Sequence, residues 1–102
     1  MAEKRNNKRV RVNMRVDYRD YTHTDQKGRV IDISKGGMYV QTGYTPEVNG
    51  YLMASLDAED FGKVIWVEGR VAWRTRTGMA VRFTNTDAKG LNNLLSSRSA
   101  PF

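Results

Sequence analysis

Alternation of apolar and polar residues runs through almost the whole 102-residue chain and restricts its fold more than any other feature. In the first such segment, Val10, Val12, Met14 and Val16 are each separated by one polar or charged residue. A period of two places successive side chains on opposite faces of an extended strand. The segment therefore predicts a strand with one buried face and one face in water.

The same period returns in five later segments. We expect the following side chains to face the core: Ile31, Ile33, Met38, Val40, Leu52, Ala54, Leu56, Val71, Trp73, Met79, Val81 and Phe83. Val30, Asp32 and Ser34 then fall on the outward face of their strand. The stretch 63–76 is interpreted as two strands that pivot near Glu68 and Gly69.

The period changes from two to that of a helix near the end of the chain. Leu91, Leu94 and Leu95 have helical spacing, and Thr86 is placed where an N-cap residue is expected. Gly90 costs such a helix about 1 kcal/mol relative to alanine. The sequence therefore predicts a short C-terminal helix that covers one end or side of the sheet.

Short strands joined by turn signals favour a mainly β fold, a small antiparallel barrel or sandwich. A barrel is preferred because closing the sheet removes exposed strand edges. The length is that of one domain. Three segments are expected: a flexible basic N-terminal arm at 1–8, the barrel and helix at 9–97, and a frayed tail at 98–102.

Composition excludes several classes of protein. There is no run of about 18 apolar residues and the N-terminus has no apolar core of the signal-peptide type, so we expect neither membrane insertion nor export. The chain has no cysteine, which excludes disulfides and thiolate metal sites. A cytoplasmic location is the simplest expectation.

Positive charge is concentrated at the N-terminus. The formal net charge is +6, and residues 1–19 hold seven Lys and Arg against two acidic residues, so nearly all the excess lies there. Such an arm favours an anionic partner, although a solubilising tail has the same composition.

Two short segments together predict an anion-binding site. Arg5 and Arg9 lie four residues apart where the arm meets the first strand, and a guanidinium binds phosphate oxygens or stacks on a purine. In the segment 32–37, Asp32 supplies a carboxylate that accepts guanine N–H groups. Gly36 and Gly37 let a ligand approach the backbone. The residues describe a receptor for a guanine nucleotide, or else a surface turn.

The chain resembles the PilZ family of bacterial cyclic di-GMP receptors. Its R-x-x-x-R motif reads Arg5 to Arg9, and its [D/N]-x-S-x-x-G motif reads Asp32 to Gly37. The stretch 67–83 is similar to the family's G-x-V-x-W and G-[MI]-G-V-x-F patterns, with Ala80 at the second glycine of the latter. The resemblance implies a six-stranded barrel.

The resemblance also implies roles for individual residues. Arg5 and Arg9 would clamp bases and phosphates, while Asp32, Ser34 and Gly37 would contact the ligand from the barrel surface. Secondary ligand contacts fall on three further residues: Lys4, Gly36 and Trp73.

The implied function is that of an adaptor without a metal or cofactor. Binding of cyclic di-GMP would order the arm and change the surface shown to an effector protein of motility, polysaccharide or regulatory machinery. The effector itself is not named by the sequence.

Three other functions are alternatives to this one. An enzyme is not expected, because the single histidine, His23, lies in a polar loop and no catalytic motif is present. A basic barrel that stacks single-stranded nucleic acid remains an alternative, although the outward aromatic residues form no clear stripe. A PilZ-like module that binds only proteins is the third.

Overall fold

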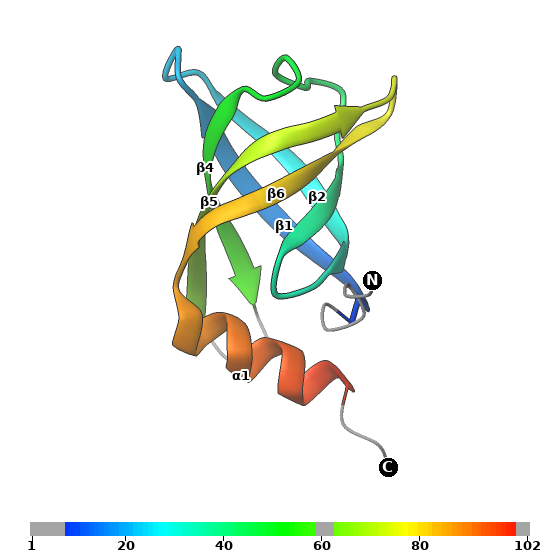
Figure 1. The fold of residues 1–102 in the computed structure, drawn as a ribbon, viewed down its shortest axis with the longest axis vertical. Helices are drawn as coiled ribbons and strands as arrows, with labels where there is room; N and C mark the ends of the chain where they lie inside the picture. Colours follow the sequence, from blue (N-terminus) through cyan, green and yellow to red (C-terminus); the bar gives the residue numbers. More distant parts are fainter. Residues whose placement is uncertain (1–7, 59–62, 100–102) are drawn as a thin grey trace, which may run out of the picture.

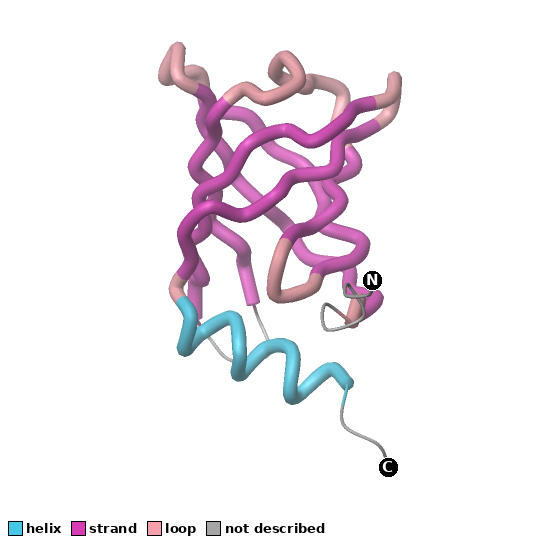
Figure 2. Tube along the Cα trace, in the orientation of Figure 1, coloured by secondary structure: helices cyan, strands magenta, loops and turns pink. Residues whose placement is uncertain are grey.

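The chain folds into a closed antiparallel barrel of six strands followed by one helix (Figures 1 and 2). The computed structural model describes residues 8–58 and 63–99. The strands are β1 (Val10–Asp20), β2 (Asp25–Ile33), β3 (Gly37–Gln41), β4 (Tyr51–Ala58), β5 (Lys63–Arg74) and β6 (Gly78–Thr86), and the helix is α1 (Ala88–Ser99). Around the barrel their order is β1-β2-β3-β6-β5-β4, with β4 paired to β1. The predicted six-stranded barrel with a C-terminal helix is confirmed.

The barrel interior is filled by the inward side chains of the alternating pattern. Val16, Val40, Leu52, Leu56 and Met79 are each at most 1% exposed. Burial of such side chains contributes about 1.5–3 kcal/mol each. The apolar alternation is therefore the main source of the fold's stability.

Helix α1 lies across one end of the barrel (Figure 1). Leu91 and Leu94 are buried in the same apolar cluster as the strands, and Leu95 packs against it. The predicted helical face is thus confirmed. Among the described residues no helix is both long and apolar enough to cross a membrane.

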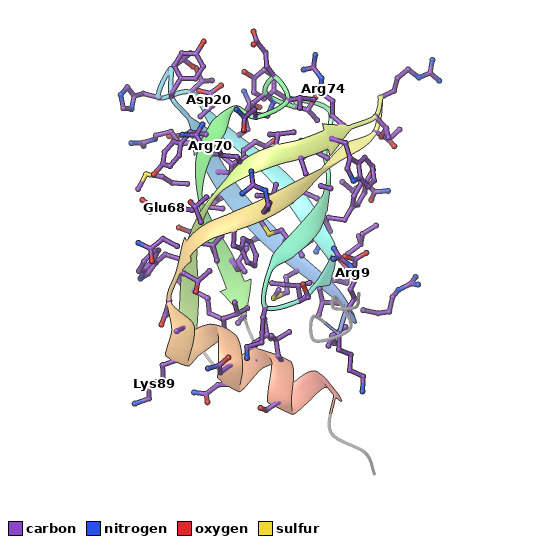
Figure 3. The ribbon with its side chains drawn as sticks, in the orientation of Figure 1. Arg9, Asp20, Glu68, Arg70, Arg74 and Lys89 are labelled. Atoms are coloured by element: carbon purple, nitrogen blue, oxygen red, sulfur yellow. The ribbon has the colours of Figure 1, made fainter. Side chains whose placement is uncertain are left out.

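A polar network lies at the opposite end of the barrel, where Asp20 is labelled in Figure 3. Asp20 is 4% exposed, and its carboxylate accepts hydrogen bonds from Tyr44 Oη at 2.6 Å and from the backbone N–H and hydroxyl of Thr22. These hydrogen bonds, that of the Thr22 hydroxyl above all, lower the pKa of Asp20 to about 2. The carboxylate is therefore charged at neutral pH and ties together the loops that close this end.

Two predicted side-chain orientations are wrong for the same reason. Val30 was expected outside but is fully buried, and Trp73 was expected inside but is 53% exposed. The register of β2 against β3 shifts between Val30 and Asp32, and that of β5 against β6 shifts between Val71 and Trp73. Each bulge adds one residue to a strand and reverses the alternation beyond it.

The predicted pivot and helix cap also differ from the structure. Residues 63–74 form one continuous strand, and Glu68 and Gly69 mark only a register shift against β6. Thr86 belongs to β6, and the capping residue is Asp87, whose Oδ1 accepts a hydrogen bond from the backbone N–H of Gly90 at 3.1 Å. The helix continues to Ser99, past the expected boundary at 97.

Candidate functional site

Arg9 and Asp32 are in direct contact on the exterior of the barrel. Arg9 precedes β1, and Asp32 lies near the end of β2, the strand that pairs with β1. Arg9 Nη2 lies 2.7 Å and Nε 3.0 Å from Asp32 Oδ1, so one carboxylate oxygen accepts both bonds. Their side chains are 49% and 28% exposed. The two sequence segments therefore meet as predicted.

Both members of this ion pair retain unused hydrogen-bonding groups. Within the described part of the chain, neither Asp32 Oδ2 nor Arg9 Nη1 has a hydrogen-bond partner. A guanidinium Nη presents two donors and a carboxylate oxygen presents two lone pairs. The ion pair can therefore offer a ligand both a donor and an acceptor without being broken.

Ser34 is placed differently from the prediction. Its side chain is 1% exposed, so the expected outward orientation is wrong. Its Oγ accepts a hydrogen bond from the backbone N–H of Gly36 at 3.2 Å and lies 3.4 Å from the carbonyl of Gly37, to which it donates. The backbone N–H of Ser34 donates to the same carbonyl at 2.8 Å. Ser34 shapes the turn between β2 and β3 from within.

Gly37 is required by the approach of two strands. It begins β3 and pairs with Arg82 of β6, and a Cβ atom on Gly37 would lie 2.4 Å from the carbonyl oxygen of Val81. Such a contact is far inside van der Waals distance. Gly36 accepts a hydrogen bond from the backbone N–H of Phe83. Both glycines therefore fix the turn against β6.

Trp73 forms an exposed aromatic pair with Tyr39. The ring centroids are 5.6 Å apart and the planes are inclined by 38°. Asp32 is paired with Tyr39, Tyr39 with Ala80, and Ala80 with Trp73 across β2, β3, β6 and β5. We call these four residues together with Arg9 the ligand strip. With strands about 4.8 Å apart, Asp32 and Trp73 are separated by about 14 Å along it.

Tyr39 was missed as a site residue, although its outward position follows from the alternation in 37–41. Gly78 makes room for it, because a Cβ there would lie 2.5 Å from Tyr39 Oη. Ala80, the departure from the family pattern, is the cross-strand partner of both aromatic residues. Only the pairing of distant strands shows this relationship.

Three further residues singled out in the sequence lie in the N-terminal quarter of the chain: Lys4, Arg5 and His23. Arg5 and Lys4 lie outside the described residues. His23 lies in the exposed loop between β1 and β2, as expected, with a φ of 66°. Among the described residues, no group of three or more His, Cys, Asp or Glu side chains is arranged to hold a metal ion.

Comparison with solved structures finds the same fold in three proteins. The Bacillus subtilis inhibitor of motility, MotI/DgrA, superimposes with a TM-score of 0.76 at 17% identity over 95% of this chain, and this chain spans 50% of MotI. The PilZ domain of YcgR from Escherichia coli, solved with c-di-GMP, gives 0.77 at 13% identity, covering 94% and 92% of the two chains. The PilZ domain of CeSA from a cellulose-synthesising bacterium gives 0.70 at 12% identity, covering 89% and 94%.

The sequence itself carries a more specific signal than these structural likenesses. No curated protein sequence matches the chain. A model of the PilZ domain, however, matches residues 3–97. This match covers both arginines of the R-x-x-x-R motif, the Asp32 to Gly37 motif and the whole barrel. The chain belongs to the PilZ domain family.

Proposed function

We propose that the chain is a cyclic di-GMP receptor that acts as an adaptor for an effector protein. The contact of Arg9 with Asp32 carries the proposal, because it unites the two halves of the signature on one exterior surface. A PilZ domain of the same fold, that of YcgR, has been solved with c-di-GMP. MotI, an inhibitor of motility, shares the fold and offers a precedent for control of a partner.

The ion pair supplies groups of both polarities to a guanine nucleotide. Arg9 holds a delocalised charge, and its Nη1, which has no partner among the described residues, can donate to a phosphate or to guanine O6 and N7. Asp32 Oδ2, which likewise has no partner in the described ranges 8–58 and 63–99, can accept from the N–H edge of a guanine. The bond to Asp32 also holds the arginine in place, so less side-chain entropy is lost when the ligand binds.

The exposed aromatic pair supplies the other end of the site. Stacking of a base on an aromatic ring contributes about 1–3 kcal/mol. Trp73 exposes half of its surface, and Tyr39 holds its ring at 5.6 Å. We infer that one base stacks at Trp73 while the phosphates lie near Arg9. Ser34, Gly36 and Gly37 then act mainly by setting the turn next to the ion pair.

The arm at 1–8 completes the proposed site through Arg5, with Lys4 as a secondary contact. Fixing five to seven residues costs on the order of 10 kcal/mol of backbone entropy. Polar residues of the arm bury too little apolar surface to offset this cost, whereas charge-assisted bonds contribute about 1.5–3 kcal/mol each. We therefore propose that the arm becomes ordered over the ligand strip when the dinucleotide binds. This ordering changes the surface presented to the effector.

Isothermal titration calorimetry with cyclic di-GMP and with GTP tests the proposal. Arg9→Ala should weaken cyclic di-GMP binding at least about tenfold, which corresponds to the loss of one charge-assisted bond. Arg19→Ala is a matched control, since Arg19 on β1 is 50% exposed and paired with Asp25 at 2.8 Å. Equal heats for both nucleotides, or an equal effect of the two substitutions, would contradict the proposal.

Nucleic-acid binding is the alternative, and the arrangement of aromatic residues argues against it. Trp66 and Trp73 are both exposed, but no pairing brings Trp66 into the strip that holds Trp73 and Tyr39. Successive bases of one strand need a continuous stacking path. Salt-titrated binding of a single-stranded oligonucleotide separates the two functions, because a steep decline with salt indicates a polyanion site.

A further inference from the structure

A hollow lies on the barrel exterior, away from the ligand strip. It encloses about 430 Å³ and is lined by residues of β1, β2, β4 and β5. Trp66, Ser55, Asp17 and Lys27 occupy successive strands at one level, since each is the cross-strand partner of the next. The small side chain of Ser55 lies between Trp66 and the charged pair. We call this hollow the Trp66 trough.

Large apolar side chains are exposed in and beside the trough. Trp66 is 45% exposed, Met53 on the neighbouring strand is 48% exposed, and Val64, two residues before Trp66, is 62% exposed. Exposed apolar side chains that gather in one place mark interaction sites more often than single ones do. The PilZ signature includes none of the three.

The closed topology puts the trough and the ligand strip on opposite walls. In the order β1-β2-β3-β6-β5-β4, the strip runs over β2, β3, β6 and β5, while the trough runs over β5, β4, β1 and β2. The centre of the strip is between β3 and β6, and that of the trough is between β4 and β1, three strands away in either direction. Figure 3 labels Glu68, whose cross-strand partner is Met53, at the left of the barrel and Arg9 at the right.

Charge in the trough is balanced, unlike that of the chain. Its four charged residues form two ion pairs, Arg19–Asp25 at 2.8 Å and Lys27–Asp17 at 3.3 Å. Their net charge is zero, whereas the chain carries +6. Two copies of a basic protein repel one another, so they approach most easily through a neutral face.

We propose that the occupant of the Trp66 trough is a second copy of this chain, with Trp66 of each copy lying in the trough of the other. Such a contact is isologous, because the same surface of each copy faces the other. The trough volume is within the range of sites that enclose small molecules, about 300–1,000 Å³, so it has room for an indole ring.

A contact of ordinary size is feasible on this face. A stable interface covers about 800 Å² of each partner. That is about one eighth of the 6388 Å² surface of the structure. Because β4 and β1 are hydrogen-bonded to each other along the wall that holds the trough, association on this face uses side chains. Tryptophan is the residue most often found at the energetic centre of such contacts.

Sedimentation equilibrium of the full chain, from micromolar concentrations to about 1 mM, tests the proposal. We expect a monomer–dimer equilibrium that tightens as NaCl increases, because salt screens the repulsion between the basic copies. Trp66→Ala should raise the dimer dissociation constant at least about tenfold. Ser55→Arg, which fills the floor of the trough at an exposed position, should do the same. Trp73→Ala, at a comparably exposed tryptophan on the other wall, should leave it unchanged.

Three results would overturn the proposal: a monomer throughout the concentration range, association that weakens with salt, or equal effects of Trp66→Ala and Trp73→Ala. Circular dichroism of each variant shows whether it is folded. If Trp66→Ala does not fold, Ser55→Arg still tests the proposal. The proposal does not depend on the ligand. Trp66→Ala should bind cyclic di-GMP as the parent does, so failure of either proposal is visible separately.

Discussion

Gly37→Ala should lower the stability of the fold, although Gly37 belongs to the ligand signature. The added Cβ would lie 2.4 Å from the carbonyl oxygen of Val81. This oxygen belongs to the backbone of β6, which is paired with β3, so it cannot move aside as a flexible side chain could. Ordinary contact begins about 1 Å further out, so β3 and β6 have to separate locally. Overpacking of this kind costs about 1–3 kcal/mol. For a domain of this size the melting temperature should fall by roughly 5–20 °C.

Gly43→Ala provides the matched control. Gly43 follows β3 by two residues, and a Cβ there meets no atom within 4 Å. Alanine at such a position is neutral or stabilises by about 0.4–1 kcal/mol, because the unfolded chain loses freedom. Thermal unfolding followed by circular dichroism measures both variants. If Gly37→Ala melts at the same temperature as Gly43→Ala, the close approach of β3 to β6 is not what requires this glycine.

Three further predictions follow from individual contacts. Hydrogen bonds hold the pKa of Asp20 at about 2, below its unfolded value, so the stability that this carboxylate contributes is present above pH 4 and is lost as the pH falls to 2. Asp20→Asn should remove this pH dependence of the free energy of unfolding, a change on the order of 1–2 kcal/mol that urea titrations at several pH values measure. Gly90→Ala should stabilise the protein by less than the roughly 1 kcal/mol expected from helix propensity, because the new Cβ would lie 2.7 Å from Asp87 Oδ2. In a protein that already carries Asp87→Ala, thermal melts should show the full stabilisation by Gly90→Ala. Trp73→Ala should weaken cyclic di-GMP binding about tenfold or more by calorimetry, while Trp66→Ala should not.

The barrel could be predicted because its determinants are local and repeated. Apolar residues at every second position specify strands, and six short strands with one wet face each favour closure. Arg9 and Asp32 could be brought together because Arg9 comes just before β1 and Asp32 lies near the end of β2, and these two strands pair antiparallel. The ion pair at 2.7 Å confirms that inference.

The wrong orientations of Val30 and Trp73 have a common physical origin in the bulges. A bulge inserts one residue into a strand, and nothing in the composition of 30–32 or 71–73 distinguishes it from regular alternation. Val30 and Trp73 were therefore assigned to the wrong face. The helix cap was misplaced by one position because Thr86 and Asp87 are both good N-cap residues. Deciding between them requires knowing that Thr86 is the last residue of β6.

Because Trp73 is exposed, the two tryptophans lie on different walls of the barrel and can serve different binding partners. If Trp73 were in the core, Trp66 would be the only exposed tryptophan, and one surface would have to serve ligand and partner alike. With both rings outside, on opposite walls of a closed sheet, each wall can be occupied while the other is also occupied. A ligand-dependent effect on association would then have to pass through the barrel or through the arm. Equal dimer dissociation constants with and without saturating cyclic di-GMP are therefore expected, and a change of more than about threefold would show that the two walls are coupled.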